Sequence, residues 1–170
     1  YLTAELFELH DRSRIELIGV NINTKDEHDE MTERISNAFD HYLIGRNLSD
    51  TELFKKLCDL KIDLAIDLAG LTDHNRINLF ARRIAPVQVN FLGFPATLGA
   101  SYIDYIIGDE TVIPPESSQY YSEQVVYMPD TFQPNDRQRP IADTPATRSE
   151  VGLPEDALVF CCFCNNYKYN

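Results

Sequence analysis

The sequence is short of basic residues: it has 15 Lys and Arg against 27 Asp and Glu, which gives a formal net charge of −12. Proteins that bind nucleic acid depend on a basic surface for most of their affinity, so this balance argues against a nucleic-acid partner. A phosphate-bearing small molecule is not excluded, because a few local groups are enough to hold one.

Long apolar runs are also lacking. The longest are far shorter than the roughly 20 residues that a membrane span needs. The sequence also lacks the basic start and following apolar stretch that are typical of a signal peptide. We therefore expect no membrane partner. Because the chain begins at Tyr1 rather than Met, we expect it to be part of a longer protein.

Cysteine is scarce: three of the four cysteines fall in one strand-like run, Cys161 to Cys164, and Cys58 lies far away. Alternate residues of a strand point to opposite faces, so this is not a disulfide framework. A Cys-x-Cys metal half-site would need a second cluster of ligands, and none has the spacing. We expect small buried side chains and no metal. The histidines also lack partners at metal-ligand or catalytic-triad spacing, and we expect them at the surface or behind the residues of a site: His10, His28, His41 and His74.

Helix-like and strand-like segments alternate along the chain. Apolar spacing predicts helices at Leu2–Leu9, at Asp26–Phe39, after a Ser49 N-cap, and at Asn75–Arg83. Apolar and β-branched runs predict strands at Ile15–Ile22, Tyr42–Ile44, Lys61–Gly70, Val87–Leu92, Tyr102–Ile107 and Gln124–Met128. Strands separated by helices imply an α/β fold with a parallel sheet covered by helices on both faces. Ligands of such sheets bind at the carboxyl ends of the strands, so the loops there are candidate sites.

The amino-acid composition changes at residues 130–151. This stretch is polar and proline-bearing and predicts an exposed connector. The residues after it, "GLPEDALVFCCFC", predict a new turn and strand. We therefore expect a first domain at 1–129, a connector at 130–151 and the start of a second domain at 152–170.

The first candidate site is Asp67–Arg76. Gly70 would free the backbone after its strand, and Thr72 or Asp73 would cap the next helix, whose N–H groups suit an anion or a sugar hydroxyl. The alternative is an ordinary capped helix with an exposed Arg76.

The second candidate is Gly93–Gly99, in "LGFPATLG". Gly93 lets the backbone approach a ligand, Pro95 stiffens the turn, and Thr97 offers a hydroxyl. The alternative is a tight crossover that only links two strands.

The third candidate is "CNNYKYN" at the end of the chain. Asn165 and Asn166 offer amide donors and Lys168 offers a cation to a diphosphate, whereas the alternative is a surface lysine after an edge strand. Asp104 and Asp109 could suggest paired carboxylates, but an odd separation puts them on opposite faces of a strand. We expect Asp109 to end the strand and cap a turn.

Three stretches together form a specific pattern: residues 67–110, 120–136 and 152–170. They include the motif R-x-A-P-x-Q-V-x-x-L-G-[YF]-P at Arg83–Pro95. The pattern resembles the catalytic region of O-linked N-acetylglucosamine transferases, above all bacterial members, which usually follow tetratricopeptide repeats. The resemblance implies a GT-B fold, in which two Rossmann-like domains face each other across a cleft that holds a nucleotide sugar. This chain would be the N-terminal half, with its first strand missing.

The resemblance also implies roles for single residues. Leu92, Gly93 and Pro95 would lie against the donor sugar, with Phe94 and Ala96 tuning the pocket. The last two depart from the usual Tyr and Gly of the family.

Three further positions, Leu71, Thr72 and Arg76, would lie on the acceptor and sugar side, although Leu71 replaces a tyrosine common there. Lys168 would neutralise the donor diphosphate, with Asn165 and Tyr167 beside it.

The implied activity is inverting transfer of N-acetylglucosamine from UDP-N-acetylglucosamine to Ser or Thr hydroxyls of proteins, in the cytoplasm. No cofactor or metal is expected, and this chain alone is not expected to be active. Relatives with the same motifs transfer fucose from GDP-fucose, as SPINDLY proteins do, or glucose from UDP-glucose, so the donor stays open. A protein-binding module without catalysis is the remaining alternative.

Overall fold

The computed structural model describes residues 1–23 and 29–163. The chain divides into two compact units, Tyr1–Arg137 and Gln138–Asn170. The first unit therefore continues past residue 129, where the sequence predicts the domain to end.

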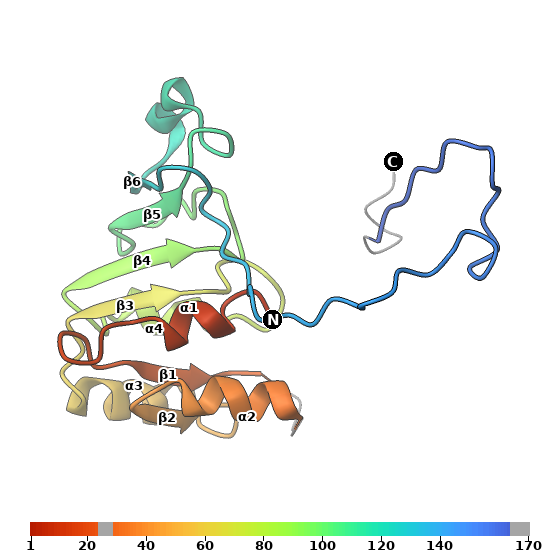
Figure 1. Cartoon of the computed structure of the whole chain (residues 1–170). Coiled ribbons are helices and arrows are strands. Elements are labelled where there is room, and N and C mark those ends of the chain that lie inside the picture. Colours follow the sequence, from red (N-terminus) through yellow and green to blue (C-terminus); the bar gives the residue numbers. More distant parts are fainter. Residues whose placement is uncertain (24–28, 164–170) are drawn as a thin grey trace. The chain divides into compact units, whose positions relative to one another are not determined.

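The described residues of the first unit form parallel strands only. Strand β1 (Ile18–Asn21) pairs with β2 (His41–Ile44) in one sheet. The second sheet has the order β3-β4-β5-β6, with bounds Leu64–Asp67, Val87–Phe91, Tyr105–Gly108 and Gln124–Tyr127 (Figure 1). The predicted α/β class with parallel strands is confirmed. The expectation of one sheet is not, because no backbone ladder joins β1 to β3.

The helices are short: α1 (Ala4–Glu8), α2 (Glu30–Asn37), α3 (Asp50–Asp59), α4 (Ile77–Ala81) and the 3-10 helix η1 (Pro115–Tyr120). Ser49 caps α3 as predicted, since its Oγ accepts from the Glu52 N–H and the Glu52 carboxylate accepts from the Ser49 N–H. At α4 the predicted caps are wrong. Neither Thr72 nor Asp73 caps it; instead Asn75 Oδ1 accepts from the Ile77 N–H at 3.2 Å.

The core lies between the helices α3 and α4 and the four-stranded sheet. Its buried members are Leu53, Leu57, Ala65, Leu79, Phe80, Ile84, Ala85 and Ile103. Val20 of β1 and Leu43 of β2 pack against the same cluster. The two sheets are therefore joined by side-chain burial, although no strand pairing connects them.

The far end of the first unit, residues 130–137, is bonded back onto it. The Phe132 N–H donates to Asp109 Oδ2 at 2.9 Å, and Arg137 donates from its backbone N–H and its guanidinium to Glu5. Arg34 of α2 donates to Asp136, whose side chain is 1% exposed. The predicted connector therefore begins with residues that belong to the first unit, which a reading of local polarity does not reveal.

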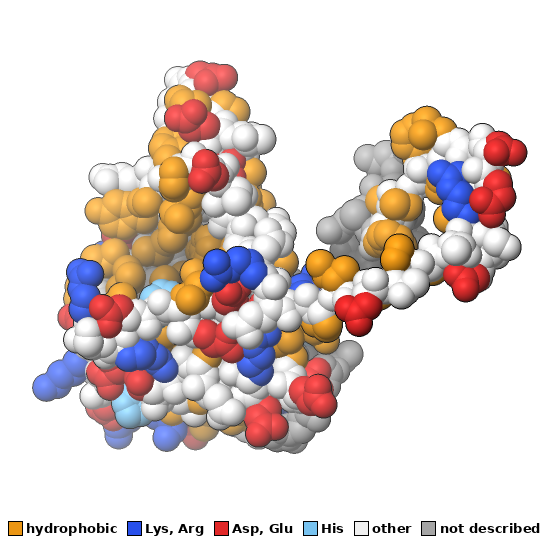
Figure 2. Space-filling model, viewed as in Figure 1, with side chains coloured by type: hydrophobic (Ala, Val, Ile, Leu, Met, Phe, Trp, Pro, Cys, Tyr) orange, Lys and Arg blue, Asp and Glu red, His pale blue; other side chains and the backbone are white. Residues whose placement is uncertain are grey.

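Exposed apolar side chains lie on one face of β3, at Leu64 and Ile66, and directly after it, at Leu68. Apolar side chains also gather over β4 and β5 in the space-filling view (Figure 2). In the part of the chain that the structure describes, no helix has the length and apolar character needed to cross a membrane.

The second unit has turns but no strand in residues 138–163. Arg148 Nη1 donates to the carbonyls of Pro154, Glu155 and Ala157. The strand predicted from "ALVFCCFC" is wrong for the described residues. A strand needs a neighbour for its N–H and C=O groups, and no other strand lies among residues 138–163. The side chain of Phe160 is 88% exposed, and Cys161 and Cys162 are exposed rather than buried as predicted.

Candidate functional site

The loop after β3 is shaped by a buried carboxylate. Asp67, the last residue of β3, accepts hydrogen bonds from the N–H groups of Ala69 (3.0 Å) and Gly70 (3.1 Å). These two bonds turn the chain directly at the carboxyl end of the strand. Gly70 then adopts a φ of +58°, in the left-handed region that favours glycine.

The loop after β4 also begins with an unusual turn. Leu92 has a φ of +72°, and the Gly93 N–H donates to the Phe91 carbonyl at 2.9 Å. This is a γ-turn with positive φ, a rare and strained form for a side chain as large as leucine.

The two loops touch each other through their glycines. A Cβ on Gly93 would lie 2.1 Å from the carbonyl oxygen of Leu68, and one on Gly70 would lie 2.3 Å from Phe94 Cβ. Both distances are far below any real contact. Gly93 is thus required for the packing of the two loops, which is a different reason from the ligand access that the sequence suggests.

Two buried polar side chains hold the loop Leu92–Gly99. Asn90 Nδ2 donates to the carbonyls of Phe94 (2.9 Å) and Ala96 (3.2 Å). At the other end, Glu123 accepts from Thr97 Oγ1 and from the Leu98 N–H, both at 2.7 Å. The loop is therefore held at Phe94, Ala96, Thr97 and Leu98, whereas Gly93 and Pro95 stay exposed.

The rest of the motif Arg83–Pro95 holds the entry to β4. Arg83 donates to the carbonyls of Tyr102 and Pro86 and pairs with Asp104, which holds the pKa of Asp104 below its ordinary value. Gln88 is fully buried: its Nε2 donates to the Phe80 and Tyr102 carbonyls, and its Oε1 accepts from the Ile84 N–H. These residues position the strand that carries the site loop.

The residues predicted on the acceptor side follow β3. Leu71 is 52% exposed, and Thr72 Oγ1 donates to the Ala69 carbonyl at 2.7 Å. The Arg76 guanidinium is bonded to Asp50 and to the carbonyls of Gly45 and Leu48, with a side chain only 19% exposed. The alternative of an exposed Arg76 is therefore wrong, and its charge is used to join α4 to the start of α3.

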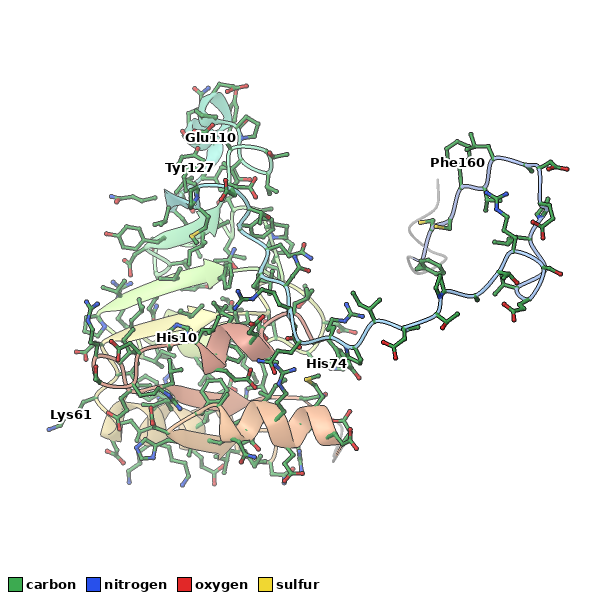
Figure 3. The ribbon with its side chains drawn as sticks, viewed as in Figure 1. His10, Lys61, His74, Glu110, Tyr127 and Phe160 are labelled. Atoms are coloured by element: carbon green, nitrogen blue, oxygen red, sulfur yellow. The ribbon has the colours of Figure 1, made fainter. Side chains whose placement is uncertain are left out.

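The loops that carry the first two candidate sites meet at the carboxyl end of the sheet, where Gly70 approaches Phe94 and Gly93 approaches Leu68. His74 lies toward the end to which β3 points, whereas Lys61 lies at the opposite end (Figure 3). The third candidate set, Asn165, Asn166, Tyr167 and Lys168, lies outside the described residues.

Other acidic and histidine residues have local roles. Asp109 accepts from the N–H groups of Thr111 and Val112, which confirms it as a turn cap. The bond from the Phe132 N–H, together with those from Val112 and Thr111, holds the pKa of Asp109 below its ordinary value. His10 bonds the Leu6 carbonyl, and His41 pairs with Glu16 at the surface. Among residues 1–23 and 29–163, no three His, Cys, Asp or Glu side chains are grouped as metal ligands. His28 lies outside these ranges.

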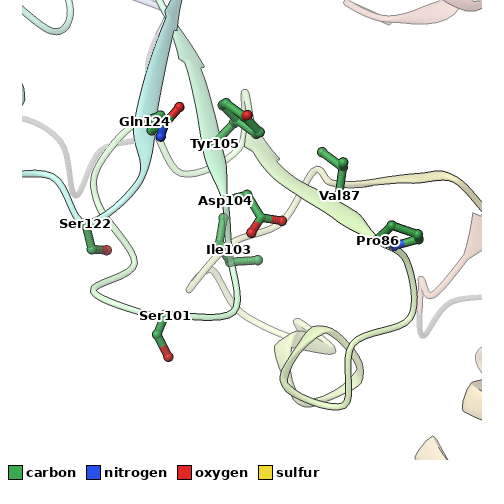
Figure 4. Close-up of a pocket in the computed structure, with 8 residues that line it drawn as sticks. All are labelled: Pro86, Val87, Ser101, Ile103, Asp104, Tyr105, Ser122 and Gln124. Carbon is green, nitrogen blue, oxygen red and sulfur yellow. The ribbon is translucent and has the colours of Figure 1, made fainter.

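An open hollow of about 400 Å³ lies at the amino-terminal ends of β4, β5 and β6 (Figure 4). Pro86, Asp104 and Gln124 are among the residues that line it. It is at the opposite ends of the strands from the contact between the two loops, although Thr97, in the second half of the later loop, bonds Ser122 at its rim. Asp104 is already paired with Arg83. Since ligands of parallel sheets bind at carboxyl ends, we place the functional site at the loops rather than in this hollow.

Sequence reasoning missed the two residues that hold the site loop, Asn90 and Glu123. Asn90 alternates with the apolar residues of its strand and so looks solvent-facing, and Glu123 precedes a strand among polar neighbours. The available signal was the rule that parallel sheets are covered on both faces, which makes a polar residue in such a strand a buried one.

Comparison with known proteins gives consistent matches. Residues 1–144 match Glycosyl transferase family 41. The chain is 35% identical over 173 residues to the probable UDP-N-acetylglucosamine–peptide N-acetylglucosaminyltransferase SEC of Arabidopsis thaliana, over 99% of this chain and 18% of that protein. It is 32% identical over 125 residues to the UDP-N-acetylglucosamine–peptide N-acetylglucosaminyltransferase of Caenorhabditis elegans, over 73% of this chain and 11% of that protein.

A solved structure agrees in fold and in sequence. A mutant of the O-GlcNAc transferase of Thermobaculum terrenum superimposes with a TM-score of 0.76 and 31% identity, over 86% of this chain and 27% of that one. The chain thus spans about a quarter or less of the proteins it matches, and its parallel α/β arrangement is part of their GT-B fold. The chain belongs to glycosyl transferase family 41.

Proposed function

We propose that the protein containing this chain is an inverting glycosyltransferase, which moves N-acetylglucosamine from UDP-N-acetylglucosamine to Ser or Thr hydroxyls of proteins. The observation that carries the proposal is the fixed loop Leu92–Gly99 at the carboxyl end of β4, in a chain of a glycosyltransferase family. The names of the plant and nematode relatives describe the same donor and a peptide acceptor. The proposal includes tetratricopeptide repeats before the catalytic region and a cytoplasmic location.

In the proposed reaction the acceptor hydroxyl oxygen attacks the anomeric carbon as the bond from that carbon to the diphosphate breaks. The hydroxyl proton passes to a base or to water, negative charge grows on the leaving diphosphate, and UDP is released. Lys168 would neutralise that charge, with Asn165 and Tyr167 beside it, and no metal ion would be needed. Among the residues of this chain, Lys168 is the one to which we assign the largest contribution to lowering the activation barrier.

The two loops would receive the sugar and the acceptor. Leu92, Gly93 and Pro95 would lie against the donor sugar, where the fixed loop gives a surface that needs no rearrangement on binding. Leu71 and Thr72 would face the acceptor side. Arg76 would act by holding that loop, since its guanidinium is already bonded to Asp50 and two carbonyls.

Donor choice is tested by calorimetry of UDP and GDP binding to the intact protein, followed by transfer assays. The assays use UDP-N-acetylglucosamine, GDP-fucose and UDP-glucose. Tighter UDP binding together with transfer of N-acetylglucosamine is expected. Tighter GDP binding would contradict the donor assignment, and transfer from none of the three would leave the protein-binding module as the better account.

The role of Lys168 is tested by Lys168→Ala in the intact protein. Loss of one group that stabilises charge in the transition state lowers kcat about a hundredfold or more. Lys55→Ala, at an exposed position of α3, is the matched control and should keep full activity. Equal activity of the two variants would refute the role, and a loss of wild-type activity on adding a chelator would refute the absence of a metal.

A further inference from the structure

Asn90 makes contacts unlike those of its neighbours in β4. Its side chain is fully buried, and its single amide nitrogen donates to two carbonyls of the same loop, Phe94 at 2.9 Å and Ala96 at 3.2 Å. Pro95 lies between them and has no N–H with which to hold itself. One side-chain nitrogen therefore fixes the backbone on both sides of Pro95.

The other half of the amide has no partner. Asn90 Oδ1 is buried and accepts no hydrogen bond from any described residue. It lies beside Gly70, where an added Cβ would be 3.5 Å from it. A buried acceptor without a partner is unfavourable, and natural proteins concentrate such exceptions at functional sites. The presence of Asn90 at this position is therefore better explained by the two loop carbonyls that its nitrogen holds than by a gain in stability.

The second half of the loop has a separate support. Glu123, which is 4% exposed, holds Thr97 and Leu98 with two bonds of 2.7 Å. These bonds do not reach Phe94 or Ala96. The shape of the segment around Pro95, which includes the residues assigned to the donor sugar, thus depends on Asn90.

We propose that Asn90 is a positioning residue for the donor sugar, acting through the carbonyls of Phe94 and Ala96. The proposal rests on the proposed function, because it assigns the sugar to this loop. The competing account is that Asn90 only stabilises the fold.

The test is Asn90→Asp in the intact protein. The new carboxyl has nearly the same size, but as a carboxylate it cannot donate to either carbonyl, whereas its protonated form donates one O–H. Burial raises the pKa of the new carboxyl, and so does the carboxylate of Asp67, the residue paired with Asn90 across β3 and β4. Protonation is therefore reached in mildly acidic buffer.

We expect kcat/KM of Asn90→Asp to fall between about tenfold and a hundredfold at a pH near 8, mainly through a higher KM for the donor. The deficit relative to wild type should shrink as the pH is lowered to about 6. Asn90→Leu, which cannot donate at any pH, should show the loss without the recovery. Asn78→Asp, the same change at an exposed position of α4, should match wild type throughout.

A loss that follows the fall in unfolding midpoint and shows no recovery at low pH, with an unchanged KM, would overturn the proposal. Hydrogen exchange of the peptide covering residues 92–98 gives a readout independent of activity. Exchange in Asn90→Asp should exceed that of wild type at the higher pH and approach it at the lower. Equal exchange at both would overturn the positioning role, whereas absent transfer by wild type with altered exchange would overturn only the assignment to a sugar.

Discussion

The contact between the two site loops can be measured with a pair of glycine substitutions. Gly70 and Gly99 both have φ in the left-handed range, at +58° and +61°. A Cβ on Gly70 would lie 2.3 Å from Phe94 Cβ, whereas a Cβ on Gly99 would meet nothing within 4 Å. Alanine at the two positions therefore introduces the same backbone strain, and only Gly70→Ala adds a collision between loops.

The expected size follows from these distances. Alanine in the left-handed region costs about 1 kcal/mol, and this is the whole effect expected for Gly99→Ala. For Gly70→Ala, Phe94 must also move by roughly 1.2 to 1.7 Å to reach an ordinary carbon–carbon separation of about 3.5 to 4.0 Å. Overpacking of this kind costs about 1 to 3 kcal/mol more. Gly70→Ala should therefore lower the free energy of unfolding by about 2 to 4 kcal/mol.

The assay is urea unfolding of the intact protein and its two variants, with donor binding measured by calorimetry on the same samples. Because Phe94 belongs to the loop assigned to the sugar, Gly70→Ala should also weaken donor binding more than Gly99→Ala does. A difference in unfolding free energy below about 0.5 kcal/mol would refute the contact, since independent surface changes vary by that much. Equal losses of stability in Gly70→Ala and Gly99→Ala, together with equal donor affinities, would also refute the contact between the loops.

Three further predictions concern the support of the site. Ser49→Ala removes the capping box with Glu52 and should lower the free energy of unfolding by about 1 kcal/mol in the same assay; no change would contradict the cap. Gln88→Leu leaves the buried Ile84 N–H unpaired, whereas the Phe80 and Tyr102 carbonyls keep bonds from Arg83, so it should cost about 1 to 3 kcal/mol, and a neutral result would refute the burial of that N–H. Hydrogen bonds from Arg137 hold the pKa of Glu5 below its ordinary value of 4.5, so the stability from this carboxylate is full above that value and is lost as the pH falls through the lowered pKa. Glu5→Gln should flatten the acid side of the plot of unfolding midpoint against pH, and an unchanged plot would exclude this role.

The sequence predicted those parts of the fold that depend on local patterns. Apolar runs located every strand of the first unit, and Ser49 with Glu52 located the start of α3, because both signals lie within a few residues. Two features were not predicted: the absence of pairing between β1 and β3, and the bonds from residues 130–137 to α1 and α2. Both depend on contacts between residues far apart in the sequence. No local pattern encodes such pairings, so they appeared only in the structure.

The same limit applies to the candidate site. The loop Gly93–Gly99 was predicted from its glycines and proline, and its place at the carboxyl end of β4 is confirmed. The reason for Gly93 was different from the one expected, because the carbonyl of Leu68 that it must accommodate comes from the loop after β3. A glycine in a sequence shows that something comes close, but not whether it is a ligand or the chain itself.

Gln88 and Asn90 show how the site can be separated from its support. Both are fully buried polar residues on the same face of β4, two positions apart. Every polar atom of the Gln88 amide has a partner, and those partners are backbone groups around the entry to the strand. Asn90 uses its nitrogen on the site loop and leaves its oxygen unpaired. A substitution at Gln88 should therefore mainly lower stability. A substitution at Asn90 also removes the unfavourable buried oxygen that has no partner, so it should mainly change the shape of the loop. The ratio of activity loss to stability loss should therefore be larger at Asn90 than at Gln88. This ratio distinguishes a residue that sets the shape of the site loop from one that only stabilises the strand before it.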